Sequence, residues 1–268
     1  MSEQIHKKRS FPGVPLTRAC RTILALILRE MATSYGRSPG GYIWAIAEPV
    51  AGIALLTFIF SLGFHAPPLG SSFALFYASG LVPFLIYSDV STKISQSINF
   101  SLPLLGYPRV TLADALLARA LLSIMTQVLV SGLVFLGLIA FLDTQSRLDI
   151  ARLAQAFLMA FAFGFGVGAI NCFLITLYPV WQRVWSILNR PMFLLSCIVF
   201  LFESIPIPYR DWLWYNPVVH IVGMTRQALF FGYTGGYVTP LYIYFLSLSL
   251  SVCGFFLIWL FKDKLLNR

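Results

Sequence analysis

Charged residues are scarce in this chain. Only 11% of its 268 residues are Asp, Glu, Lys or Arg, whereas 58% are hydrophobic and the mean hydropathy is +0.80. Soluble domains carry about 25% charged residues. The composition therefore excludes a soluble globular protein. Because no stretch rich in Ser, Gly or charge divides the sequence, we expect one all-α polytopic membrane domain with a polar N-terminal tail.

Cysteine and histidine are few and scattered. The chain has four cysteines and three histidines: Cys20, Cys172, Cys197, Cys253, His6, His65 and His220. No CxxC pair occurs, and three of the cysteines lie in apolar segments where a thiol packs as a small hydrophobic group. The histidines show no HExxH or similar spacing. We expect neither a disulfide framework nor a metal site.

None of the five lysines follows a glycine. The P-loop motif GxxxxGK[ST] is therefore excluded, and the chain cannot bind ATP through a P-loop of its own. The basic start MSEQIHKKRSFPGVP is not followed directly by an apolar core and a small-residue cleavage site, so we expect no cleaved signal peptide. The chain also lacks the His/Asp or multi-Arg/His cluster that a polytopic membrane enzyme would require, and we expect no catalytic residues.

Six apolar segments bounded by Pro, Gly or charge are predicted to cross the bilayer. They are Ile43–Phe64, Phe73–Val90, Ala120–Leu142, Leu153–Tyr178, Pro191–Ile207 and Leu241–Phe261. The uncharged core of the fifth, Pro191–Phe202, is too short to cross about 30 Å of hydrocarbon unaided. Glu203–Pro240 is too polar for a span and too apolar for a free loop, which predicts two re-entrant or interfacial half-helices.

The net charge of +9 would indicate nucleic acid in a soluble protein, but here its distribution reports topology. When the segments between spans are assigned alternately to two sides, one side holds only four of the 19 basic residues: Arg147, Arg152, Arg210 and Arg226. The positive-inside rule then places both termini in the cytoplasm. We expect no nucleic-acid partner.

Residues 1–40 are predicted to form a cytoplasmic tail and an amphipathic helix, and residues 41–268 the transmembrane domain. Between Pro15 and Ser38, apolar residues recur at helical spacing while Arg18, Arg21 and Arg29 take the other face. Such a helix lies along the cytoplasmic leaflet in contact with membrane lipid. It is either a topology anchor on anionic lipid or a gate for substrate.

The segment Ser91–Arg119, between the second and third spans, is long and contains Pro103 and Pro108. A short helix broken by Pro and carrying few charges suits docking into a groove on a partner. The alternative is an ordinary connector, but connectors of this length without a function are uncommon.

Ionisable residues within spans are functional candidates, because each is costly in hydrocarbon unless paired or hydrated. They are Glu48, which can pair with Arg37 or Arg29, Asp89 near Lys93, and Asp114 and Arg119 at the entry to the third span. For each, a structural ion pair near the headgroups is the alternative to direct contact with substrate. Three glycines in the fourth span, Gly164, Gly166 and Gly168, indicate close helix packing.

Aromatic residues make up 16% of the chain. Most are typical of interface belts, because Trp and Tyr favour the headgroup level of the membrane. A minority facing an internal canal would stack on the flat apolar faces of sugar rings. The candidates for this role are Tyr42, Trp44, Trp181 and Trp185.

Three segments follow one another in the order REMATSYGRSPGGYIWAIAEP (Arg29–Pro49), LPLLGYPRVTLADALLAR (Leu102–Arg119) and YNPVVHIVGMTR (Tyr215–Arg226). With them the chain resembles the membrane subunit of ABC-2 type exporters of capsular polysaccharide. The resemblance implies six transmembrane helices, an N-terminal amphipathic interface helix, a cytoplasmic coupling helix and periplasmic re-entrant helices between spans five and six.

The resemblance further implies a homodimer in the bacterial inner membrane, paired with two copies of an ABC ATPase subunit that binds ATP and Mg. The cargo would be a lipid-linked acidic polysaccharide. Nucleotide-driven motion would reach the chain at Ser101, Leu102, Pro103, Leu104, Leu105, Tyr107 and Arg109. A periplasmic polysaccharide co-polymerase linked to an outer-membrane exporter would contact Pro206–Gly236, with Tyr209, Trp212, Trp214, Tyr215 and His220 as candidates.

Two basic residues near the first span suit such a cargo. Arg29 and Arg37 can hold the phosphate of a lipid anchor or acidic sugars, whereas positive-inside topology explains them without a substrate. With Glu48 they complete the predicted canal set. The alternatives to capsule export are an ABC-2 exporter of O-antigen, teichoic acid or a small molecule, and a polytopic membrane enzyme.

Overall fold

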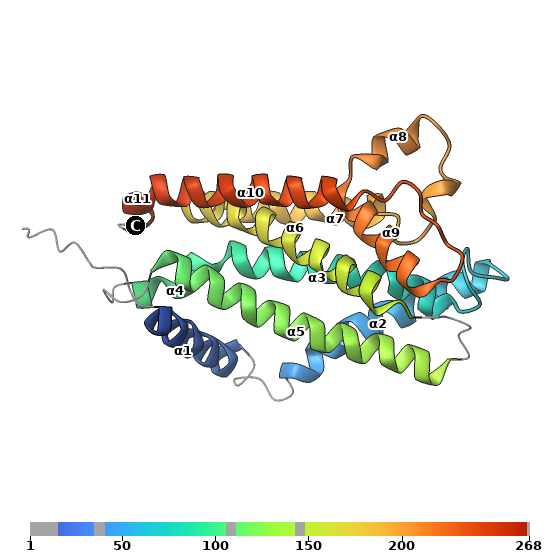
Figure 1. Cartoon of the computed structure of the whole chain (residues 1–268), viewed down its shortest axis with the longest axis horizontal. Coiled ribbons are helices and arrows are strands. Elements are labelled where there is room, and N and C mark those ends of the chain that lie inside the picture. Colours follow the sequence, from blue (N-terminus) through green and yellow to red (C-terminus); the bar gives the residue numbers. More distant parts are fainter. Residues whose placement is uncertain (1–15, 35–40, 106–110, 143–147, 267–268) are drawn as a thin grey trace, which may run out of the picture.

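The computed structural model describes residues 16–34, 41–105, 111–142 and 148–266, and within these ranges every regular element is helical (Figure 1). The elements are α1 (Leu16–Ser34), α2 (Gly41–Gly63), α3 (Phe73–Ser95), α4 (Ser97–Leu105), α5 (Leu112–Phe141), α6 (Ile150–Leu177), α7 (Val180–Leu195), the 3-10 helix η1 (Phe202–Ser204), α8 (Tyr209–Trp214), α9 (Pro217–Leu229), α10 (Pro240–Leu260) and α11 (Lys262–Leu266). The all-helical fold class is confirmed.

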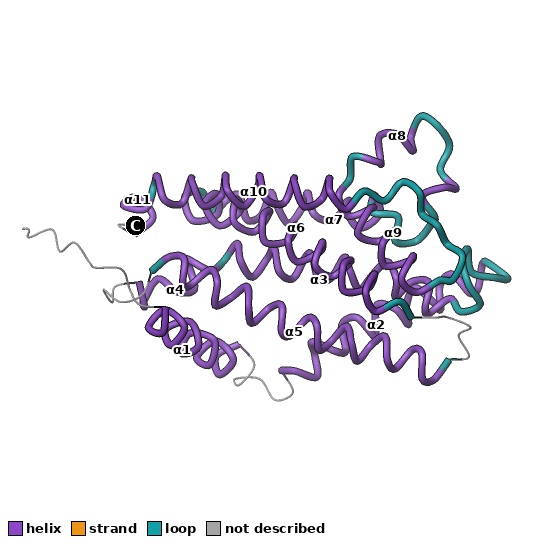
Figure 2. Tube along the Cα trace, viewed as in Figure 1, coloured by secondary structure: helices purple, strands orange, loops and turns teal. Residues whose placement is uncertain are grey.

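The long helices run side by side, and most loops gather at the end of the bundle that carries α8 and α9 (Figure 2). We call this the α9 end. The opposite end, where α1, α4 and α11 lie, is the α4 end (Figure 1). The α9 end is tied to the start of α6, because the Asp149 backbone N–H donates to the Ala228 carbonyl at 2.9 Å.

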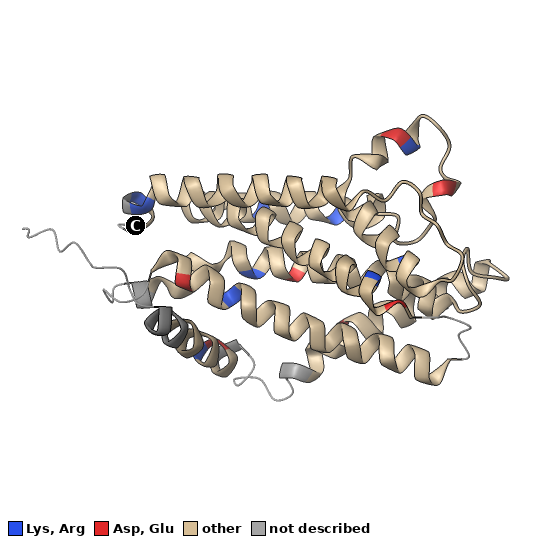
Figure 3. Cartoon of the chain, in the orientation of Figure 1, with Lys and Arg blue, Asp and Glu red and all other residues tan. Residues whose placement is uncertain are grey.

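Five described helices, α2, α3, α5, α6 and α10, are long and apolar enough to cross a membrane. They confirm five of the six predicted spans, and Figure 3 shows α10 free of charged residues along its length. α5 begins at Leu112 rather than Ala120 because a capping box starts it. The Asp114 N–H donates to Thr111 Oγ1, and Asp114 Oδ2 accepts from the Thr111 N–H, both at 3.1 Å. Asp114 is therefore a helix cap, and it forms no ion pair with another described residue.

The prediction of a fifth span over Pro191–Ile207 is wrong as a single helix. α7 begins at Val180 and ends at Leu195, and turns follow in which Cys197 has a positive φ of 56°. Arg183 and Arg190, which made this region look like a loop, lie on the exposed side of α7. α7 runs from the α4 end to the α9 end, where Asn216 Nδ2 donates to the Leu195 carbonyl at 2.9 Å.

α6 lies at the centre and packs against α3, α9 and α10. Gly164 and Gly168 face α3, and Gly166 faces α10. A Cβ on Gly164 would lie 2.9 Å from the Tyr87 carbonyl oxygen, and one on Gly166 would lie 2.7 Å from the Ser247 carbonyl oxygen. The glycines let the backbones approach closely, as expected for helix packing in lipid.

α1 packs on α5 at the α4 end. Leu24, Leu28 and Met31 are exposed on α1, whereas Glu30 is only 7% exposed. The helix therefore presents apolar side chains away from the bundle and an acidic side chain toward it.

Candidate functional site

The predicted coupling segment begins as helix α4, which packs on α5 and α6. Ser101 is buried, and Leu102 beside it is 41% exposed. The remaining predicted coupling residues are Pro103, Leu104 and Leu105, which end α4, and Tyr107 and Arg109, which lie outside the described residues. A short helix is therefore present where the sequence predicted one, with an apolar side chain on its surface.

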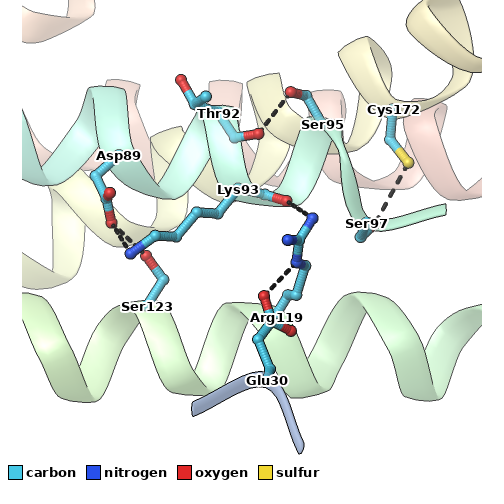
Figure 4. Close-up of polar contacts among 9 residues, drawn as sticks. All are labelled: Glu30, Asp89, Thr92, Lys93, Ser95, Ser97, Arg119, Ser123 and Cys172. Carbon is cyan, nitrogen blue, oxygen red and sulfur yellow. Dashed lines mark hydrogen bonds and ion pairs between the residues drawn. The ribbon is translucent and has the colours of Figure 1, made fainter. Parts of the chain in front are cut away.

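Polar contacts hold α4 and α3 to their neighbours at this end (Figure 4). The Ser97 hydroxyl, at the start of α4, lies 3.4 Å from the Cys172 thiol of α6. Asp89 and Lys93 of α3 form an ion pair at 3.0 Å, and Asp89 Oδ2 also accepts from Ser123 Oγ of α5 at 2.8 Å. The predicted pairing of Asp89 with Lys93 is confirmed, and it lies one turn along the same helix.

Arg119 of α5 contacts three other helices, and Figure 4 shows its contacts with α1 and α3. Its Nε donates to Glu30 Oε1 of α1, and its Nη1 donates to the Lys93 carbonyl of α3 at 3.1 Å. Its guanidinium also lies 4.2 Å from the ring centroid of Phe100 in α4. Arg119 and Glu30 side chains are only 8% and 9% exposed. The sequence interpretation placed Arg119 in an ion pair near the headgroups but missed Glu30 as its partner.

A groove with a volume of about 480 Å³ separates α3 from α7, and both polar and apolar side chains line it. Its uncharged polar lining is Thr92, Ser95, Gln96, Gln182, Ser186 and Asn189. Aromatic side chains, Trp185 among them, line it together with Ile175 and the cationic Arg190, and none of the described lining residues is acidic. Trp185, predicted to face a canal, therefore lies among hydroxyl and amide groups in an otherwise apolar bundle.

Glu48 lines a second cavity, of about 220 Å³, between α2, α3 and α5. Asp89 and Thr92 line it as well, and Thr92 also lines the α3–α7 groove. Polar hollows therefore lie on both sides of α3. Glu48 has no ion pair within the described part of the chain, so its expected pairing with Arg29 does not form. The Arg29 guanidinium instead lies 5.9 Å from the Phe100 ring, and Arg37 lies outside the described residues.

The other predicted canal aromatics do not join Trp185. Trp44 on α2 is 68% exposed, and the side chain of Tyr42 is outside the described part. Trp181 Nε1 donates to Asn171 Oδ1 at 2.8 Å, which fastens the start of α7 to α6. The structure therefore disperses the predicted canal set over at least three surfaces.

The short helix α8 projects from the α9 end (Figure 1). Three of the predicted contact residues, Tyr209, Trp212 and Tyr215, are 67%, 80% and 67% exposed. Trp214 is half-buried and stacks on Tyr242 with ring centroids 5.4 Å apart. These side chains form an exposed aromatic surface that is anchored to α10 through Trp214.

His220 does not belong to this surface, and its prediction as a contact residue is wrong. It is fully buried, its Nδ1 accepts the Thr239 N–H at 3.1 Å, and its Nε2 lies 2.7 Å from the Trp214 carbonyl. Because Nδ1 accepts, Nε2 carries the proton and donates, and the ring is neutral with both nitrogens engaged. No group of three His, Cys, Asp or Glu side chains able to hold a metal ion occurs in residues 16–34, 41–105, 111–142 or 148–266.

The loop after α9 carries two tyrosines, one of which donates a hydrogen bond to the side chain of Glu203. Tyr233 Oη donates to Glu203 Oε1 at 2.9 Å, and the hydroxyls of Tyr233 and Tyr237 lie 3.3 Å apart. Burial raises the pKa of Tyr237 to about 12, so its hydroxyl keeps its proton at physiological pH. The loop is therefore held against η1, which carries Glu203.

Arg226 of α9 is the buried charge that sequence reasoning missed. It is fully buried, and its guanidinium donates to the carbonyls of Cys197 (2.8 Å), Ile198 (3.1 Å) and Phe200 (3.1 Å) in the turns after α7. The guanidinium also lies 4.6 Å from the ring centroid of Phe76. The available signal was a lone arginine in the apolar run VVHIVGMTR, because such a charge persists only where it is hydrogen-bonded.

Five long apolar helices around a glycine-packed centre, with buried polar contacts at their ends, define a multi-pass helical membrane protein. Residues 21–230 match the family model for ABC-2 type transporters. The match covers well over half of the chain, and the protein belongs to this family of membrane transport subunits.

Curated relatives cover most of the sequence. The chain is 34% identical over 214 residues to "Polysialic acid transport protein KpsM" of Escherichia coli, a match that spans 79% of this chain and 82% of the relative. It is 26% identical over 256 residues, 94% of each chain, to "Capsule polysaccharide export inner-membrane protein CtrC" of Neisseria meningitidis serogroup A. It is also 24% identical to "Capsule polysaccharide export inner-membrane protein BexB" of Haemophilus influenzae, over 78% of this chain and 79% of the relative.

Proposed function

We propose that this chain is the membrane subunit of an ATP-driven ABC transporter that exports lipid-linked capsular polysaccharide across the bacterial inner membrane. The names of the relatives supply the substrate class. The observation in the structure that carries the proposal is the α3–α7 groove, because its lining combines hydroxyl and amide groups with aromatic rings, the two kinds of group that suit a sugar.

The groove suits a sugar chain. Its volume of about 480 Å³ lies within the roughly 300–1,000 Å³ of ligand sites. The hydroxyl and amide groups are partners for sugar hydroxyls, and Trp185 offers an apolar ring face. Arg190 would attract the carboxylates or phosphates of an acidic polysaccharide, and no acidic residue in the lining opposes it.

Two copies of this chain would form the canal together with two copies of a separate ABC ATPase, which would bind ATP and Mg. In the proposal the ATPase contacts α4 and the residues up to Arg109. The exposed apolar Leu102, next to the buried Ser101, supports this, because a surface apolar side chain on a short helix is what a groove on a partner would accept.

In the proposed topology α7 is the fifth of six crossings and both termini are cytoplasmic. The path of α7 from the α4 end to the α9 end supports the crossing. α8 and α9 would then be the periplasmic re-entrant pair. α9 spans only Pro217–Leu229, too short to cross, yet almost all of its residues are buried.

The exposed aromatic surface of α8 would contact a periplasmic co-polymerase that leads to the outer membrane. Tyr209, Trp212 and Tyr215 support this assignment, because large exposed aromatic residues are typical of interface centres. At the opposite side, Arg29 and Arg37 would bind the phosphate of the lipid anchor as it enters.

The test is complementation in a capsule-forming strain that lacks its own export permease, with the cognate ATPase co-expressed. We expect surface polysaccharide to return. Trp185→Ala and Arg190→Gln in the groove should lower export several-fold at equal membrane levels of protein, whereas Trp259→Ala, a 66% exposed position on α10, should not. Export of a different cell-surface glycan in place of capsule, or full export by both groove variants, would contradict the proposal.

A further inference from the structure

A buried ion pair joins α1 to the bundle. Glu30 and Arg119 lie 89 positions apart in the sequence, and both side chains are nearly inaccessible. A charge pair shielded in this way loses much of its hydration, so it persists only with good geometry and further hydrogen bonds. A helix that served only as a lipid anchor would need its apolar face and nothing of this kind.

α1 therefore has two different attachments. Leu24 and Leu28 are 59% exposed and suit the lipid interface, whereas Glu30 turns into the protein. The basic partner lies in α5, on which α1 packs. The position of α1 is therefore fixed by a specific side-chain contact as well as by apolar partition.

Arg119 extends this attachment to α4. Its guanidinium lies over the ring of Phe100 at 4.2 Å, close enough for a cation–π contact, while Nη1 holds the Lys93 carbonyl near the end of α3. Arginine suits such a position because its planar fork donates in several directions while its face packs on a ring. Glu30, Arg119 and Phe100 thus form a continuous chain from α1 to α4.

We propose that Arg119 is a positioning residue that makes α1 and α4 move as one unit. The inference rests on the proposed function, in which an ATPase displaces α4. A displacement of Phe100 would then carry Arg119 and Glu30 with it, and α1 would shift at the cytoplasmic leaflet where a lipid-linked cargo enters. The amphipathic helix is thus part of the coupling apparatus and not a passive anchor.

The test uses the full transporter, permease with its ATPase, in liposomes. Arg119→Gln breaks both links of Arg119, whereas Phe100→Leu keeps the ion pair and removes the ring contacts of α4 with Arg119 and with Arg29 of α1. We expect both variants to assemble and hydrolyse ATP, but to export about 5-fold less polysaccharide per ATP hydrolysed than the parent. A factor of about 5 is at the low end of the coupling that is typical between two sites of one protein. Arg152→Gln, which removes an exposed ion pair with Asp149 on α6, is the matched control and should change neither quantity.

A distance measurement separates coupling from stability. Spin labels at Leu24→Cys and Asn99→Cys, both exposed positions outside the predicted coupling residues Ser101–Arg109, report the α1–α4 distance with and without ATP in a background free of other cysteines. We expect one distance in both states for the parent and two distances for Phe100→Leu. A nucleotide-dependent distance in the parent, or a constant one in Phe100→Leu, overturns the inference. A parent that exports no polysaccharide contradicts the proposed function, whereas a parent and a Phe100→Leu variant that export equally contradict only the coupling role.

Discussion

Replacement of Arg226 by Met should destabilise the protein more than any other single loss of a charge at the α9 end. The guanidinium is fully buried and donates to three carbonyls in the turns that follow α7. Met is apolar and fills the inner part of the site, but its side chain has three fewer heavy atoms than Arg and donates no hydrogen bond. The turns would keep their shape only by leaving these carbonyls without partners.

The magnitude follows from the contacts. Each buried acceptor left without its donor costs about 1–3 kcal/mol, so three cost roughly 3–9 kcal/mol. Removal of a buried charge that has no paired carboxylate offsets part of this, which leaves about 3 kcal/mol. At roughly 2–4 °C per kcal/mol for a chain of this size, the melting temperature should fall by about 10 °C. Arg226→Lys should cost less, because an ammonium keeps the charge but cannot span all three carbonyls.

The assay is thermal unfolding of the purified protein in detergent, followed by tryptophan fluorescence and by size-exclusion chromatography. Arg210→Met, at a half-exposed position on α8, is the control and should melt like the parent. If Arg226→Met melts within about 2 °C of the parent, the carbonyl contacts contribute little and the reasoning is refuted.

Two further substitutions test packing and hydrogen bonding. Gly254→Ala places a Cβ 2.8 Å from the backbone of Ala169 and should destabilise the folded protein by about 1–3 kcal/mol. In the control Gly132→Ala, the new Cβ meets nothing within 4 Å and the protein should not be destabilised. Equal melting temperatures of the two variants would contradict close packing of α10 on α6. His220→Leu leaves one buried carbonyl and one N–H without partners and should cost about 2–4 kcal/mol, while His65→Leu at an exposed position should be neutral. If His220→Leu is as stable as the parent, the hydrogen bonds of the His220 ring nitrogens contribute nothing to stability.

Long uninterrupted apolar runs made five spans predictable. In lipid, a long apolar segment is almost always a helix, because every backbone N–H and C=O must be hydrogen-bonded within the protein. The glycines of α6 were also interpreted correctly. What the sequence did not reveal is that Gly164 and Gly166 serve two different helices, since this depends on which neighbours pack on α6.

The errors in the bounds of the spans share one cause: charged residues were taken as the ends of spans although they lie within helices. The start of α5 was placed too late because Asp114 is a cap and Arg119 is paired with Glu30. α7 was placed too late because Arg183 and Arg190 looked incompatible with a membrane helix. Neither pattern is visible at the level of local hydropathy.

The candidate site was predictable in part for the same reason. The position of α4 followed from its prolines and its place between two spans. Trp185 lines the α3–α7 groove, and its role in a canal stays a prediction. His220 looked like a polar residue on a surface segment but is a buried hydrogen-bonding residue. Helix packing decides which aromatic residues line the same groove. The chemistry of each residue taken alone does not reveal this.

The bracing of the turns after α7 by Arg226 has a consequence for biosynthesis. The arginine lies 26 residues after Phe200 and 29 after Cys197 in the chain. At roughly 5–20 residues per second, the ribosome finishes these turns about 1–6 seconds before it supplies the side chain that binds them. During this interval the three carbonyls in the turns after α7 lie at the membrane without their hydrogen bonds to Arg226. A membrane insertase that shields this segment until α9 emerges would therefore determine how much of the protein matures.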